Sequence, residues 1–144
     1  MTPSVLGPET ACWLISATAD VPRVPGHPWA LADAVMDLSR RVHDGGPLGS
    51  ATRPFRQQPW KADQLTQDAV WRLVAAGRMI QAGSGWHAGH EVPRAEREDA
   101  GRVLGSLPRA EQRAVIVAAQ RLVAMATIWS KNPVADGPAR FSTV

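Results

Sequence analysis

Apolar side chains recur at helical spacing in two stretches of the chain, and a glycine follows each stretch. The first predicts a helix from about residue 28 to Gly45, with an apolar face of Leu31, Ala34, Val35, Leu38 and Val42. The second predicts a helix over residues 63–76, with an apolar face of Leu65, Ala69, Val70, Leu73 and Val74. Because glycine adopts a left-handed conformation without steric cost, we expect Gly77 to end the second helix.

The segments around the first helix have no clear period. Residues 8–19 are apolar and could form a short helix or a strand, because a short apolar run fits both. Residues 20–28 contain three prolines, which favour an extended connector over regular structure. Residues 45–59 mix glycine, proline, serine and threonine, so we expect a loop, which could include a short strand or a turn of helix.

The second half of the chain predicts a β-hairpin and then two helices. Residues 78–82 and 86–92 flank a glycine turn, and a strand in the latter segment would place Trp86, Ala88, His90 and Val92 on one face. Residues 94–104 mix acidic and basic side chains, which favours a solvated helix. Residues 108–129 predict a long helix that is apolar nearly all round from residue 114, so we expect burial on more than one side.

These elements predict one domain of the α+β class, mostly α, with a small β-hairpin and a long C-terminal helix. The domain covers residues 1–130, and residues 131–144 predict a disordered tail. The chain has 144 residues, 44% of them hydrophobic and 20% charged, which is typical of a globular domain. No stretch has the pattern of a signal peptide or a membrane span, so we expect a cytoplasmic protein without membrane contact. Its single cysteine, Cys12, lies in an apolar segment and predicts a buried structural thiol.

The order helix, loop, helix ending in glycine, and tight hairpin resembles a winged helix-turn-helix. Residues 31–42 correspond to a first helix, 63–76 to the recognition helix and 78–92 to the wing, so the resemblance covers about half of the chain. The segment 69–80 is similar to the junction of recognition helix and wing in many such regulators. The prolines and glycines of residues 45–59 depart from the family pattern, in which another short helix lies there.

The resemblance implies that the chain binds double-stranded DNA, as a small transcriptional regulator or a nucleoid-type factor. The recognition helix would enter the major groove, and the wing would reach an adjacent groove or phosphate. The net charge of +3 permits a polyanionic partner. The candidate nucleic-acid-binding residues are Arg53, Arg56, Lys61, Gln64, Gln67, Arg72, Arg78 and His87.

The alternative is a helical protein-interaction module, such as an adaptor, an antitoxin-like partner or an assembly component. Trp13, Trp71 and Trp129 lie in apolar segments and predict core positions, whereas Trp29, Trp60 and Trp86 lie beside proline or glycine. The long C-terminal helix could supply the contact of a homodimer. The candidate interface residues are Trp29, Trp60, Trp86, Leu122, Met125 and Trp129.

The sequence predicts no enzyme activity and no cofactor. It contains no phosphate-binding glycine motif, no nucleophile elbow and no zinc-protease motif. His87, His90 and Glu91 are the one group with metal-ligand chemistry, but on a strand His87 and His90 face opposite sides. We therefore predict no metal site.

Overall fold

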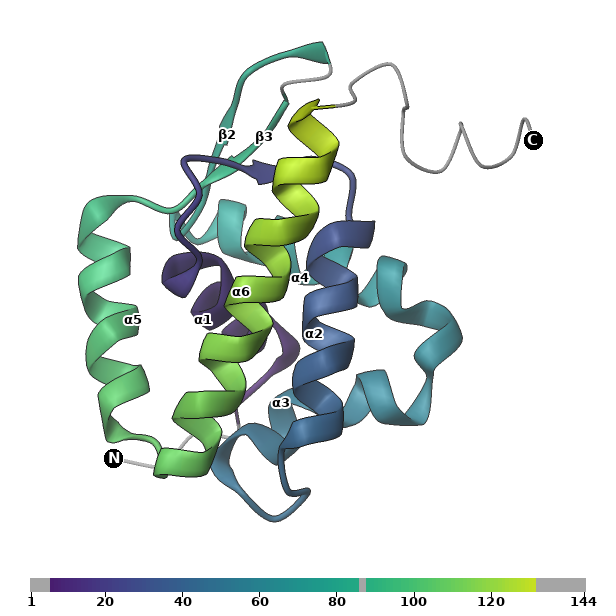
Figure 1. The fold of residues 1–144 in the computed structure, drawn as a ribbon, viewed down its shortest axis with the longest axis vertical. Helices are drawn as coiled ribbons and strands as arrows, with labels where there is room; N and C mark the ends of the chain where they lie inside the picture. Colours follow the sequence, from purple (N-terminus) through teal and green to yellow (C-terminus); the bar gives the residue numbers. More distant parts are fainter. Residues whose placement is uncertain (1–5, 86–87, 132–144) are drawn as a thin grey trace.

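Helices dominate the part of the chain that the structure, a computed structural model, describes: residues 6–85 and 88–131 (Figure 1). The helices are α1 Pro8–Thr18, α2 Trp29–Arg41, α3 Pro47–Gln57, the 3-10 helix η1 Pro59–Lys61, α4 Ala62–Ala75, α5 Arg94–Ser106 and α6 Arg109–Lys131. The strands are β1 Val24–Pro25, β2 Ile80–Ala82 and β3 Gly89–Glu91. The fold is therefore α+β and mostly α, which confirms the predicted class.

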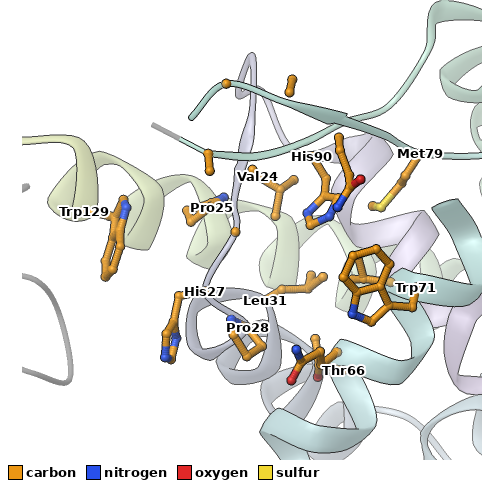
Figure 2. A pocket seen from close by; sticks show the side chains of 18 of the residues that line it. Val24, Pro25, His27, Pro28, Leu31, Thr66, Trp71, Met79, His90 and Trp129 are labelled. Atoms are coloured by element: carbon orange, nitrogen blue, oxygen red, sulfur yellow. The ribbon is translucent and has the colours of Figure 1, made fainter. Parts of the chain in front are cut away.

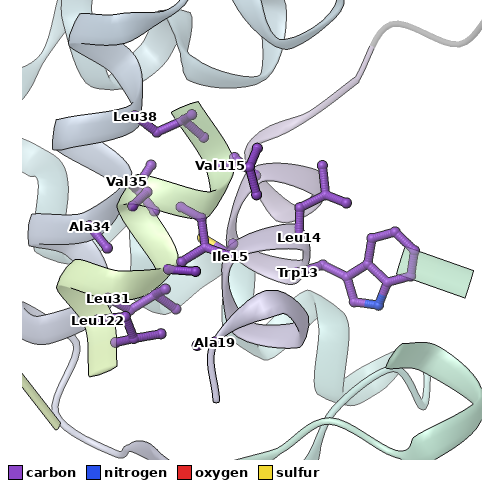
Figure 3. Packing of buried hydrophobic residues seen from close by; sticks show 14 of the residues in the cluster. Trp13, Leu14, Ile15, Ala19, Leu31, Ala34, Val35, Leu38, Val115 and Leu122 are labelled. Atoms are coloured by element: carbon purple, nitrogen blue, oxygen red, sulfur yellow. The ribbon is translucent and has the colours of Figure 1, made fainter. Parts of the chain in front are cut away.

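Helix α1 lies at the centre of the molecule, behind α6 in the view of Figure 1. Residues 11–16 are all buried, which a helix requires when neighbours cover it on several sides. Figure 3 shows Ile15 directed toward α2 and α6, where Val35 and Leu122 lie, while Trp13 and Leu14 point to other sides. This packing explains why residues 8–19 carry no helical period in the sequence.

Residues 47–57 form a helix, so the loop expected over residues 45–59 is wrong for most of that segment. Pro47 lies in the first turn, where a missing N–H leaves no hydrogen bond unmade. Leu48, Ala51 and Phe55 recur at helical spacing and are fully buried. Pro54 lies inside the helix and removes one backbone hydrogen bond. Burial of this apolar face outweighs that cost, so the segment forms a helix although its glycines and prolines favour a loop.

The N-terminus of α3 is held by a carboxylate from a distant part of the chain. Glu111, on α6, is buried, and its Oε1 accepts a hydrogen bond of 3.1 Å from the backbone N–H of Leu48. Gly46, the residue before α3, provides no side-chain cap of its own. A Cβ at Gly46 would lie 2.0 Å from Glu111 Oε2, so glycine is needed there for the carboxylate to approach. The negative charge also complements the helix dipole.

The hairpin follows α4 directly, because Gly77 adopts the left-handed conformation (φ +76°) that ends the helix as predicted. Strands β2 and β3 pair antiparallel, and β1 pairs antiparallel with the other edge of β3. The sheet therefore has the order β1-β3-β2, with Val24 and Gln81 both opposite His90. The prediction that residues 20–28 contain no regular structure is wrong for Val24–Pro25, which form strand β1.

Helix α6 packs against α1 and α2 along one side, and its other side is exposed. The buried side carries Val115 and Leu122, whereas Ile116 and Ile128 are exposed. Burial on several sides is therefore a property of α1 rather than of α6. No helix in residues 6–85 and 88–131 is both long and apolar enough to cross a membrane.

Candidate binding groove

A groove of about 720 Å³ opens between the sheet and the helices (Figure 2). The β1–α2 connection, α4, the hairpin and the end of α6 all contribute to its walls. Its volume falls within the range of roughly 300–1,000 Å³ that is typical of ligand pockets. Because four separate parts of the chain line it, the groove exists only in the folded molecule.

Aromatic rings mark both ends of the groove. At one end, the ring of Trp129 stacks on His27 with a centroid distance of 6.1 Å, and it meets Trp29 at 6.0 Å. At the other end, Trp71 meets His90 edge to face at 6.4 Å and 84°. Figure 2 shows the two ends separated by Leu31, Pro25 and Pro28. The groove therefore offers flat aromatic surfaces at both of its ends.

Two polar atoms in the groove wall lack hydrogen-bond partners within the described part of the chain. They are Oγ1 of Thr66, which is fully buried on α4, and Nε2 of His90, which lies on the central strand. A buried polar atom without a partner costs about 1–3 kcal/mol, so such atoms are rare in folded proteins. Burial also lowers the pKa of His90, which keeps the ring neutral at pH 7.

The described wall of the groove contains no charged side chain. Its polar groups come from glutamine, threonine and histidine: Thr66, Gln67, Gln81, His27 and His90. A phosphate or a free carboxylate would lose its hydration here without gaining an ion pair. The groove therefore suits a neutral occupant.

The sequence-predicted arginines lie in two separate groups, and each arginine has an acidic partner. Arg53 and Arg56, on α3, both bind Asp44, at 3.2 Å and 2.5 Å. This arrangement lowers the pKa of the Asp44 carboxyl, chiefly through the hydrogen bond from Arg56. Arg56 also donates to the backbone oxygens of Ser39 and Gly49, so it joins α3 to α2.

The second group lies beside α1 and α5. Arg72 pairs with Glu9 at 3.2 Å, and Arg78 lies 3.9 Å from Glu96. The guanidinium of Arg78 also stacks over the ring of Trp13 at 5.0 Å. These arginines therefore contribute to contacts within the fold, which does not follow from their positions in the sequence.

The remaining predicted nucleic-acid contacts are exposed or lie outside the described residues. Lys61 and Gln64 are exposed, and Gln64 donates to Asp68 on the same helix. Gln67 is exposed at the rim of the groove. His87 lies outside the described residues.

An exposed stripe runs from η1 along α4 into the groove. Its members are Trp60, in η1, and Gln64, Gln67 and Trp71, whose spacing of three and four residues places them on one face of α4. Trp60 is 76% exposed and Trp71 is 49% exposed, and Trp71 also lines the groove. The prediction that Trp71 lies in the core is therefore wrong. The helical period of the sequence could have indicated this exposure, because position 71 falls outside the apolar face formed by Leu65, Ala69 and Leu73.

The predicted interface residues are dispersed. Trp60 is exposed, and Trp29 and Trp129 are half-buried against each other beside the groove. Met125 packs partly against the core. Leu122 has no exposed surface and belongs to the core, so it cannot contact a partner in this structure. Trp86 lies outside the described residues.

Other candidate chemistry is not assembled in the described residues. They contain no cluster of three metal-ligating side chains, and Glu91 pairs with Arg23 at 2.9 Å. Cys12 is fully buried, and burial raises the pKa of its thiol to about 12. Comparisons with protein-family models, with curated proteins and with solved structures find no significant match to the chain.

Proposed function

We propose that this chain is a protein-interaction module that binds its partner through the α4 stripe and the adjoining groove. One observation carries the proposal: two large aromatic side chains, Trp60 in η1 and Trp71 on α4, are exposed, and Trp71 lines a groove whose described wall contains no charged side chain. Tryptophan is enriched among the residues that dominate protein–protein binding energy, because it combines a large apolar area with few rotatable bonds.

Electrostatics supports a protein partner over a nucleic acid. DNA affinity depends largely on cations that neutralise phosphates, but the arginines of α3 and α4 already pair with carboxylates. The exposed surface of α4 also carries Asp63 and Asp68, which would repel a phosphate backbone. A DNA-binding mode would have to overcome both effects.

DNA binding remains a second candidate because of one specific observation. The strand order β1-β3-β2, with α4 directly before the hairpin, is the arrangement that a winged helix would need. On that reading α4 would face the major groove, and Lys61, Gln64 and Gln67 would lie at the contact.

Site-specific photocrosslinking in cells that carry the native chain tests the leading proposal. A benzoylphenylalanine at position 64, in the middle of the stripe, should give a discrete protein adduct. Trp71→Ala should remove that adduct, and the photoprobe at position 98, exposed on α5, should give none. An adduct with a second copy of the chain would make the partner the chain itself. Equal adducts from positions 64 and 98 would contradict the proposal.

Fluorescence anisotropy on mixed duplex DNA over a salt series tests the second candidate. If the proposal holds, the chain gives no saturable binding at low salt. Saturable binding that weakens steeply as salt rises, and that Lys61→Ala makes weaker and less salt-dependent, would favour DNA instead. Each neutralised phosphate contributes about 0.9 to the slope of log affinity against log salt.

A further inference from the structure

Helix α6 ends beside the groove. Trp129 lines the groove and stacks on His27, and the helix ends two residues later, at Lys131. Helix α6 also contacts β1, and Figure 1 shows its last turns next to that strand. Figure 2 shows Trp129 and Trp71 at opposite ends of the groove. The chain that follows α6 therefore starts at one end of the groove, and Trp71 lies at the other.

The C-terminal segment, residues 132–144, has the composition that the groove wall favours. The segment lies outside the described residues, and its two charged side chains, Asp136 and Arg140, have opposite signs. The residues on either side of that pair are uncharged, and the described wall of the groove has no charged side chain. Phe141 is the one aromatic residue of the segment, and an aromatic ring fits beside the exposed ring of Trp71.

The C-terminal segment is also long enough to cross the groove. Phe141 follows Lys131 by ten residues, and ten extended residues span up to about 33 Å. A channel of about 720 Å³ with the cross-section of one extended strand, about 5 by 10 Å, would be about 15 Å long. Phe141 can therefore reach Trp71 by a path that is far from straight.

We propose that the C-terminal segment occupies the groove of its own chain, with the ring of Phe141 against Trp71, and that it competes there with the partner protein. The residues that directly follow α6 then pass the aromatic end formed by His27 and Trp129. The competition rests on the proposed function, because it concerns the same site, whereas the docking of the segment does not.

Attachment to the chain favours this occupant over a free ligand of the same chemistry. A group on a short tether meets its site at an effective concentration on the order of millimolar. We expect docking with a dissociation constant of about that size, which fills the groove in about half of the molecules. The apparent affinity for the partner is then about twofold lower than that of an open groove.

Intramolecular photocrosslinking of the purified full chain tests the docking. Benzoylphenylalanine replaces Phe141, so that an aromatic ring is kept at this position. At about 10 μM chain, a second copy cannot compete with a millimolar effective concentration, so the adduct should have the mass of one chain. Peptide mass spectrometry should place the adduct on α4 near Trp71 or on β2, and not on α5.

Two exposed tryptophans provide matched variants for this crosslink. Trp71→Ala removes the ring in the groove and should lose most of the adduct. Trp60→Ala removes a ring that is more exposed and does not line the groove, so the adduct should be unchanged. Because both side chains are exposed, both variants should retain the wild-type circular dichroism spectrum.

Amide chemical shifts provide a second measurement without a photoprobe. In the isotope-labelled full chain, Phe141→Ala should shift the amide signals of Trp71 and Gln81, which line the groove. Asp136→Ala, in the same segment, should leave these signals in place. Neither substitution changes a residue of the described fold, so a shift at the groove reports on contact with the segment.

The position-64 crosslink in cells tests the competition. Phe141→Ala should raise the yield of the partner adduct about twofold, because it frees the groove in about half of the molecules. An unchanged yield would refute the competition, even where the single-chain adduct forms. If position 64 gives no partner adduct in either chain, the proposed function fails, and the photoprobe at position 141 still decides the docking.

Three results would overturn the docking itself. The first is an adduct with the mass of two chains, which would place the segment on a second copy. The second is a set of adducts spread equally over α3, α5 and the groove. The third is the absence of any adduct together with unchanged amide signals in Phe141→Ala. Equal loss of the adduct in Trp71→Ala and Trp60→Ala would refute the assigned contact with Trp71.

Discussion

Arg56 provides a direct test of the distinction between a DNA contact and a residue that holds the fold together. Its guanidinium donates to Thr52 Oγ1, to Asp44 and to the backbone oxygens of Ser39 and Gly49, and 27% of the side chain is exposed. Hydrogen bonds to charged groups contribute about 1.5–3 kcal/mol each in favourable cases, and these bonds share one partly exposed group. We therefore expect Arg56→Ala to lower the free energy of unfolding by about 2–3 kcal/mol.

Arg53, on the same helix, is the matched control. Within the described residues it pairs with Asp44, and 45% of its side chain is exposed. Exposed ion pairs contribute about 0–1 kcal/mol, so Arg53→Ala should change stability little. Urea denaturation followed by circular dichroism measures both variants. Arg56→Lys should restore only part of the stability, because an ammonium cannot reproduce the fork of donors. Equal losses from Arg53→Ala and Arg56→Ala would refute this account of Arg56.

Three further predictions concern buried groups. Glu111→Ala should lower the free energy of unfolding by about 1–3 kcal/mol in urea denaturation, because the backbone N–H of Leu48 loses its acceptor. The control is Glu98→Ala, on an exposed surface, which should lower it by less than about 0.5 kcal/mol. Cys12 should react with a thiol reagent at pH 8 only when the chain unfolds, and fast labelling of the native protein would contradict its burial. Burial lowers the pKa of His90 from 6.5 in the folded state, so the unfolded state binds a proton at this imidazole more readily. The free energy of unfolding should therefore fall as pH falls from 6.5 toward the lower pKa of the folded state. Urea denaturation across that pH range should show a shallower fall for His90→Gln.

The helices whose large apolar side chains recur at helical spacing were predictable from the sequence. Helix α4 buries one side, and its period and the glycine at position 77 locate it well. Helix α2 is buried on more than one side, but Leu31, Val35 and Leu38 still mark its period. Helix α1 is covered on several sides and has no such period. In α3, the spacing of Leu48, Ala51 and Phe55 predicts the helix, but the local preferences of glycine and proline predict a loop. Tertiary burial decides the outcome there.

The groove could be predicted only in part, because its walls come from segments far apart in the chain. The position of Trp71 outside the apolar face of α4 was a usable signal. Nothing in the sequence brings Thr66 and His90 to the same groove, since that arrangement depends on how the sheet packs against α4. The charge partners of Arg56, Arg72 and Arg78 likewise become visible only in three dimensions.

The central position of α1 determines when the domain can fold during its synthesis. The surfaces that cover Ile15 include Val35 of α2 and Leu122 of α6, and the latter is made more than a hundred residues after Ile15. At about 5–20 residues per second, the ribosome needs roughly ten seconds to reach it. During that interval the most apolar segment of the chain lacks its final cover. Chains that terminate before α6 should therefore aggregate, because the domain can complete its core only after α6 has been synthesised.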